Sequence, residues 1–141
     1  MKTPIKKKKI KRIKKPSISK LKKKLWKVCT EFIRLRDKNQ CFTCGNKCVG
    51  KNNHTGHFVT SMLCNLELRY DPMNLRTQCL RCNLFMNGNT VIFYRRMIKD
   101  FGQEYVDAIC DQIGKPVVWK RSDYEAKILF YERALEMLKM R

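Results

Sequence analysis

Long apolar runs are missing from this chain of 141 residues. No stretch approaches the roughly 20 residues that a membrane-spanning helix needs. No apolar segment follows the basic N-terminus as it does in a secretory signal peptide. We therefore expect a protein that is neither inserted in a membrane nor exported, and whose cysteines stay reduced in a cytoplasm.

Acidic residues are absent from the first 30 positions, because Glu31 is the first of them. Residues 1–27 hold fourteen of the 32 lysines and arginines, and so carry most of the net charge of +20. Such a block attracts a polyanion, and that binding weakens as salt rises. Residues 1–16 contain too few large apolar side chains for a membrane-binding face. We expect them to form a disordered arm that binds nucleic acid; the alternative is a solvated arm that only aids solubility.

Histidine is scarce whereas cysteine is plentiful, with two histidines against eight cysteines. Both histidines lie between two CxxC pairs, and the two-residue spacer lets both sulfurs of a pair reach one ion. The pairs predict structural Zn²⁺, with disulfides as the alternative interpretation. The predicted ligands are Cys41, Cys44, Cys79 and Cys82. Cys48 is either a substitute ligand or a free thiol, and the remaining three cysteines are expected in buried packing.

The hydrophobic pattern predicts one α+β domain over residues 17–141, with a core at 41–89 between helices at 17–37 and 90–140. Ser17 or Ser19 is the expected cap of the first helix. Strands are expected at residues 54–61 and 66–70. A short helix is expected from Cys79 to Gly88, followed by helices at 90–100 and 103–113. A Ser122–Glu125 capping box is expected to open the last helix.

Residues of the core suit phosphodiester hydrolysis, which needs a base for water and a cation at the leaving oxygen. A strand end holding His57 against a short helix with Asn83 would place a base and a metal ligand on facing elements. Asn83 and Asn87 are four apart and would share one face of a helix. Their carbonyl oxygens suit hard ions such as Mg²⁺.

An ordered set of motifs in this chain resembles a known family. Its central members are Gly56-His57-Phe58, Asn74-Leu75 and Cys79-x-x-Cys82-Asn83; the rest are Phe32 to Asp37, Cys41-x-x-Cys44-Gly45, Gly88-Asn89 and a charged helix from Tyr124 to Lys139. The set resembles the HNH endonucleases with their ββα-metal (His-Me finger) core. More closely, it is similar to the NinG/Rap recombination proteins of lambdoid phages. The resemblance covers roughly residues 26–138.

The resemblance implies a zinc-stapled ββα-metal core and cleavage of branched DNA, such as Holliday junctions or D-loops, in the cytoplasm of a bacterial host. His57 would be the general base. Asn83 would bind the catalytic Mg²⁺ or Mn²⁺ with help from Asn87, and Asn74 would hold the loop beside His57. No small-molecule cofactor is expected, and symmetric cutting of a junction would favour a homodimer.

Three arginines are predicted phosphate contacts on charge and proximity: Arg69, Arg76 and Arg81. One departure stands out, because many HNH enzymes have an acidic or histidine metal ligand where this chain has Gly56. His54 would replace this missing metal ligand if the backbone places its ring near the same position. Two alternatives follow from this departure: a nuclease that binds its metal weakly, and a nuclease that has lost activity. A non-catalytic zinc-stabilised nucleic-acid-binding protein is the main alternative, and a homing or restriction enzyme shares the same core.

Overall fold

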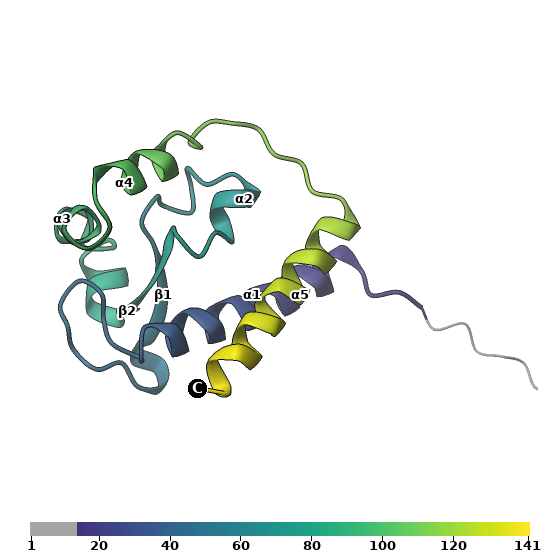
Figure 1. Ribbon diagram of the computed structural model, residues 1–141, viewed down its shortest axis with the longest axis horizontal. Helices are drawn as coiled ribbons and strands as arrows, with labels where there is room; N and C mark the ends of the chain where they lie inside the picture. The colour runs from purple at the N-terminus through teal and green to yellow at the C-terminus, as the bar shows by residue number, and fades with distance from the viewer. Residues whose placement is uncertain (1–13) are drawn as a thin grey trace, which may run out of the picture.

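The computed structural model describes residues 14–141, so nearly all of the predicted arm (residues 1–16) lies outside the described residues. Its elements are α1 (Ile18–Arg36), a 3-10 turn (Gly50–Asn52), β1 (Asn53–His57), α2 (Leu66–Arg69), β2 (Leu75–Cys79), a π-helical turn (Arg81–Phe85), α3 (Thr90–Phe101), α4 (Gln103–Cys110) and α5 (Arg121–Lys139). The α+β class is confirmed, with one hairpin among several helices (Figure 1).

The first and last helices lie side by side along one edge of the molecule (Figure 1). Ser17 caps α1 as expected, since its hydroxyl accepts from the Lys20 N–H at 3.3 Å. The buried stripe of α1 recurs at helical spacing and faces a similar stripe of α5. The stripe of α1 consists of Leu21, Leu25, Cys29 and Ile33, and that of α5 contains Tyr124, Ile128 and Tyr131. The Tyr131 hydroxyl donates to the Tyr70 carbonyl at 2.6 Å, which joins this pair to the core.

The hairpin pairs β1 with β2 antiparallel, and His54 lies opposite Gln78 while His57 lies opposite Leu75. The expected second strand at 66–70 is wrong, because those residues form α2. Asn65 caps that turn by accepting from the Leu68 N–H at 2.9 Å. The true partner strand, Leu75–Cys79, is only five residues long and is buried at all five positions, its polar residues Arg76, Thr77 and Gln78 included.

The segment after Cys79 is only partly the helix that its sequence suggested. It forms a π-helical turn over Arg81–Phe85, and the chain then turns through Asn87 and Asn89 with φ of 47° and 48°. Gly88 between them has a φ of 85°. Three consecutive residues in the left-handed region end the helix before Gly88 and start α3 in a new direction.

Helices α3 and α4 cover the other side of the hairpin, with Gly102 (φ 87°) between them. Buried residues of α3 and α4 (Phe93, Met97, Val106 and Ile109) pack against Leu68 of α2 and Val59 of the loop after β1. The predicted helix at 103–113 ends early, at Cys110. The Ser122–Glu125 capping box is wrong: the Asp123 carboxylate caps α5 by accepting from the Lys120 N–H at 2.6 Å.

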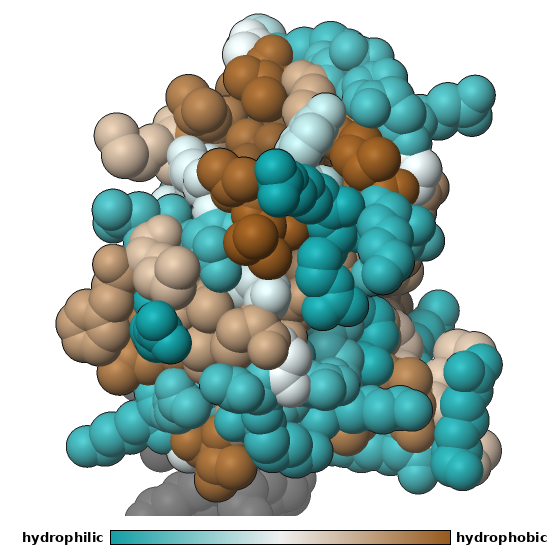
Figure 2. Space-filling view, turned by 90° about the vertical axis from the view of Figure 1, so that its left-hand side faces the viewer, coloured by the Kyte–Doolittle hydropathy of each residue, from teal (hydrophilic) through white to brown (hydrophobic). Residues whose placement is uncertain are grey.

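Hydrophobic and hydrophilic side chains alternate over the side of the molecule that carries α3 (Figure 2). Its exposed apolar residues come from the π-helical turn and the first turns of α3, and include Leu84, Phe85, Val91 and Ile92. No helix within residues 14–141 is both long and apolar enough to cross a membrane.

Candidate functional site

The two CxxC pairs meet at one end of the hairpin. The Sγ atoms of Cys41, Cys44, Cys79 and Cys82 all lie within 4.8 Å of one another. The Cys44 and Cys79 sulfurs are 3.7 Å apart, close to the roughly 3.8 Å edge of a tetrahedron with Zn–S bonds of about 2.3 Å. The four-cysteine cluster therefore fits a structural Zn²⁺, as its spacing predicted.

Hydrogen bonds favour the ionised form of one thiol of the cluster, that of Cys41. Burial opposes ionisation of the Cys41 thiol, yet the Thr43 hydroxyl and nearby backbone N–H groups lower its pKa to about 6. Burial and the neighbouring sulfurs raise the pKa of Cys44 to about 12. A bound cation would favour loss of the proton from Cys44, because metal ligation by a thiol requires its deprotonated form.

Cys48 is buried against the cluster but is not one of the four converging sulfurs. Its thiol donates to the Asn46 carbonyl at 3.7 Å. Burial and the charges of the neighbouring cysteines raise its pKa to about 11. Cys48 thus fits the free-thiol interpretation rather than that of a substitute ligand.

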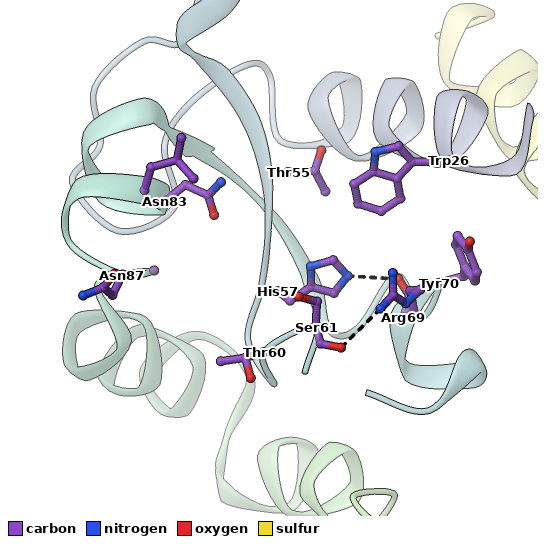
Figure 3. Close-up of a pocket in the computed structure, with 11 residues that line it drawn as sticks. Trp26, Thr55, His57, Thr60, Ser61, Arg69, Tyr70, Asn83 and Asn87 are labelled. Atoms are coloured by element: carbon purple, nitrogen blue, oxygen red, sulfur yellow. Dashed lines mark hydrogen bonds between the residues drawn. The ribbon is translucent and has the colours of Figure 1, made fainter. Parts of the chain in front are cut away.

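A pocket of about 500 Å³ opens between α1, the end of β1, α2 and the turn after Asn83. His57 lies at its centre, half-buried, with its ring stacked on that of Trp26 at 5.7 Å and an interplanar angle of 4° (Figure 3). The other lining residues are Thr55, Thr60, Ser61, Arg69, Tyr70, Asn83, Leu84, Asn87 and Gly88.

The protonation state of His57 follows from its surroundings. Nε2 lies 3.2 Å from the Arg69 carbonyl oxygen, which can only accept, so Nε2 carries the proton. Burial, together with the charge of Arg69, lowers the pKa of His57 from 6.5. Nδ1 is therefore a free base at neutral pH, and Figure 3 shows it on the side of the ring facing Thr55 and Asn83.

Asn83 reaches the same pocket from the π-helical turn. Its Nδ2 lies 3.3 Å from Nδ1 of His54, whose Nε2 donates to the Lys51 carbonyl at 3.0 Å. His54 Nδ1 is thus the acceptor and Asn83 Nδ2 the donor, which leaves Asn83 Oδ1 for another partner. The backbone of β1 therefore places the His54 ring in hydrogen-bonding contact with Asn83.

Asn87 also lines the pocket, but the reason given for it from the sequence is wrong. The spacing of four residues predicts that Asn87 shares one face of a helix with Asn83. In the structure the helix ends at Phe85, and Asn87 lies in the turn beyond it. In Figure 3 the Asn83 amide points toward β1 and the Asn87 amide points away from it.

Asn74 is fully buried and joins the two loops beside His57. Its Oδ1 accepts from the Val59 N–H at 2.7 Å, and its Nδ2 donates to the carbonyls of Val59 and Leu68 at 3.3 and 3.1 Å. Its own carbonyl accepts from the N–H of Phe58, the residue after His57, at 2.8 Å.

The three arginines separate in space. Arg69 is exposed at the pocket and donates to the Ser61 carbonyl at 3.3 Å; Arg81 is exposed but does not line the pocket. Arg76 is only 5% exposed, with its guanidinium 4.5 Å from the Phe101 ring and hydrogen-bonded to the Tyr105 hydroxyl. A buried guanidinium of this kind serves packing, so we remove Arg76 from the predicted phosphate contacts.

Trp26 and Tyr70, which line the pocket, were missed, and so was Gln78, which does not line it but lies behind Gly56. The two aromatics belong to a helix and a turn far from His57 in sequence, and helical spacing marks Trp26 only as a neighbour of Leu25 in a basic helix. Gln78 precedes a zinc cysteine, and its contact with the strand residue Gly56 depends on the β register. No local signal identifies any of the three.

The segment of this chain that matches known proteins contains both the four-cysteine cluster and the pocket. The family described as "Bacteriophage Lambda NinG protein" matches residues 2–140. Relatives called Protein ninG include those of Escherichia phage 933W (37% identical over 79 residues, 55% of this chain and 38% of the relative) and Escherichia phage lambda (35%, with the same coverage). That of Salmonella phage P22 is 30% identical over 109 residues, 77% of this chain and 52% of the relative.

The chain thus spans about two fifths to one half of the length of the curated relatives it matches. No solved structure matches it. Because the family pattern extends over almost the whole chain, including both CxxC pairs and every residue of the pocket, the protein belongs to the NinG family of lambdoid bacteriophages.

Proposed function

We propose that this chain is a metal-dependent endonuclease with a ββα-metal core that cuts branched DNA during phage recombination in a bacterial cytoplasm. The observation that carries the proposal is the state of His57. A backbone carbonyl holds its Nε2 proton, burial lowers its pKa, and its unprotonated Nδ1 opens into a pocket shared with Asn83. This is the arrangement that a general base for water requires.

The fit of a divalent ion depends on the pocket's oxygen donors. The Asn83 carbonyl oxygen is left without a partner by the His54 contact, and amide oxygens suit hard ions such as Mg²⁺ or Mn²⁺. When bound, such an ion would supply positive charge for the leaving 3′ oxygen. Asn83 would hold it, and Asn87 remains available at the rim.

The remaining steps belong to side chains of this chain. His57 Nδ1 would take the proton of the attacking water, and the Arg69 carbonyl would stabilise the imidazolium that results. Asn74 would keep the loop after β1 in place, because it accepts from the N–H groups of Phe58 and Val59, the two residues that follow His57. Exposed Arg69 would contact a phosphate at the pocket mouth, and Arg81 one further along the surface.

The test is cleavage of a labelled four-way junction beside a linear duplex of the same sequence, using zinc-loaded protein with and without Mg²⁺ or Mn²⁺. We expect divalent-dependent cuts that favour the junction and leave a 5′-phosphate. His57→Ala should still bind but lose cleavage by at least about 100-fold, the usual contribution of a general base. Gln103→Ala, an exposed residue of α4 outside the pocket, is the control.

A non-catalytic nucleic-acid-binding protein is the second candidate, and the net charge of +20 favours it. It predicts that the wild type and His57→Ala bind equally and that neither cuts with any metal. That result would remove the catalytic proposal and leave zinc with a purely structural role.

A further inference from the structure

The residue before His57 is glycine because another side chain occupies the space that a side chain there would take. A Cβ on Gly56 would collide with Oε1 of Gln78 and lie 2.8 Å from its Cδ. The same point lies 3.2 Å from Oδ1 of Asn83. Gln78 is on β2 and faces this point through the hairpin register, which sets it opposite His54.

The orientation of the Gln78 amide is set by its nitrogen. Nε2 donates to the Gly88 carbonyl at 2.8 Å and to the Thr43 hydroxyl at 3.2 Å. The oxygen must then be the end that faces Gly56. This Oε1 is fully buried and has no hydrogen-bond partner within residues 14–141. A buried carbonyl oxygen left without a partner is destabilising, so a positive partner is expected there.

Asn83 presents a second oxygen to the same place. His54 accepts from Asn83 Nδ2 at 3.3 Å, which turns the Asn83 oxygen toward Gly56 and away from the histidine. Two amide oxygens therefore converge beside a glycine, and neither has a donor assigned to it. His54 acts as a positioning residue for one of them, and Gly88 and Thr43 do so for the other.

We propose that Gln78 Oε1 and Asn83 Oδ1 are joint protein ligands of the divalent ion, and that Gln78 replaces, from the neighbouring strand, the ligand missing at Gly56. This inference rests on the proposed function, because it names a further ligand of the same ion. A role for Gln78 in packing alone explains the two bonds of its nitrogen. It does not explain why the buried end is an oxygen with no partner.

The first test needs no variant. Substoichiometric Mn²⁺ is added to zinc-loaded wild-type protein, and side-chain amide resonances are followed by NMR, because Mn²⁺ broadens nuclei close to it. We expect the amide protons of Gln78 and Asn83 to broaden first, while those of the exposed Gln103 stay sharp. Broadening of the Asn83 and Asn87 amides without that of Gln78 would overturn the inference and leave the proposed function intact.

The second test measures Mn²⁺ affinity by electron paramagnetic resonance, without DNA. Gln78→Met keeps the volume and removes the oxygen, so affinity should fall at least about tenfold, the loss that follows removal of even a supporting group at a metal site. Asn83→Asp places a formal charge on the second ligand and should tighten binding. Gln103→Met is the matched control and should leave affinity unchanged.

The outcomes separate the two proposals. If Gln78→Met folds and binds Mn²⁺ like the wild type, while Asn83→Ala loses the ion, the role of Gln78 is refuted and the endonuclease proposal stands. If Gln78→Met does not fold, the wild-type NMR experiment decides. If the wild type binds no Mn²⁺ beyond its zinc site even with junction DNA present, both proposals fail together.

Discussion

His57 owes its chemistry to neighbours from three separate elements. Trp26 of α1 covers one face of the ring, the Arg69 carbonyl fixes the proton on Nε2, and Asn74 holds the following loop. Trp26 itself is 38% exposed, so part of the indole remains free to contact a ligand in the pocket. The site therefore depends on single contacts that individual substitutions can remove.

The depressed pKa of His57 leads to a prediction about pH. The ring is an active base only when neutral, so cleavage should fall as pH drops through a midpoint below 6.5. Trp26→Ala would admit water to the ring and weaken the desolvation that lowers this pKa. We expect the acid limb of the pH–rate profile, and the NMR titration of His57, to move toward higher pH. Trp26→Phe retains a stacking ring and should shift both less; an unchanged titration in Trp26→Ala would contradict the assignment.

Asn74 gives a prediction about stability at the same scale. Asn74→Asp keeps the acceptor for the Val59 N–H but turns two donors into acceptors that face the carbonyls of Val59 and Leu68. The free energy of unfolding should fall by at least about 2 kcal/mol, since buried groups lose their partners. Denaturant unfolding of zinc-loaded protein measures this, with exposed Asn46→Asp as the control. Equal stabilities of the two variants would show that Asn74 is not a structural tie.

At the scale of elements, the zinc cluster closes the hairpin. It joins the turn after α1 to the end of β2 and to the π-helical turn, which carries Asn83. The hairpin contains only two strands of five residues each, too little to be stable alone. A Zn²⁺ bound at the four cysteines would therefore stabilise the segment that carries His57 and Asn83.

Removal of single cysteines tests this arrangement. Cys44→Ser should lower zinc content below one ion per chain and lower the melting temperature, because a thiolate ligand is lost. Cys48→Ser should retain one zinc, since its thiol donates to Asn46 instead of joining the four sulfurs. Metal analysis and thermal unfolding of both variants provide the comparison. The control is Cys110→Ser, because Cys110 is exposed and its expected burial is wrong. Loss of zinc from Cys48→Ser alone would mean that the ligand set has been misassigned.

Across the whole molecule, charge is concentrated at the N-terminal end of the chain. Residues 2–13 carry seven lysines and arginines and no acid, whereas the pocket lies within residues 26–88. Affinity for DNA and selectivity for its shape should therefore be separable.

Deletion of residues 2–13 tests that separation. DNA affinity at low salt should fall, and the slope of log affinity against log salt should become shallower by up to about 6, or 0.9 per charge lost. Cut positions on the junction should not change. A variant with these seven residues replaced by glutamine keeps the length of the arm and should behave like the deletion. An unaltered salt slope would show that the arm does not contact DNA.

Local patterns in the sequence were enough to predict the four-cysteine cluster and the positions of α1 and α3. A CxxC turn directs two sulfurs within four residues, and a helical stripe repeats within one turn, so neighbouring residues carry these features. The overall α+β class followed from the same local signals. The Ser122 capping box and the strand at 66–70 failed, since a competing cap at Asp123 and a short helix after Asn65 suit those residues equally well.

The pocket depended on contacts that join distant parts of the chain. β2 is only five residues long and is buried on both faces although three of its residues are polar, and its pairing with β1 is what reveals it. That pairing sets Gln78 against Gly56, and the packing of α1 brings Trp26 onto His57 across 31 positions of sequence. Helical and strand periods describe neighbours along the chain, whereas register and packing arise when the whole core is buried at once, and they place Gln78 and Asn83 beside Gly56.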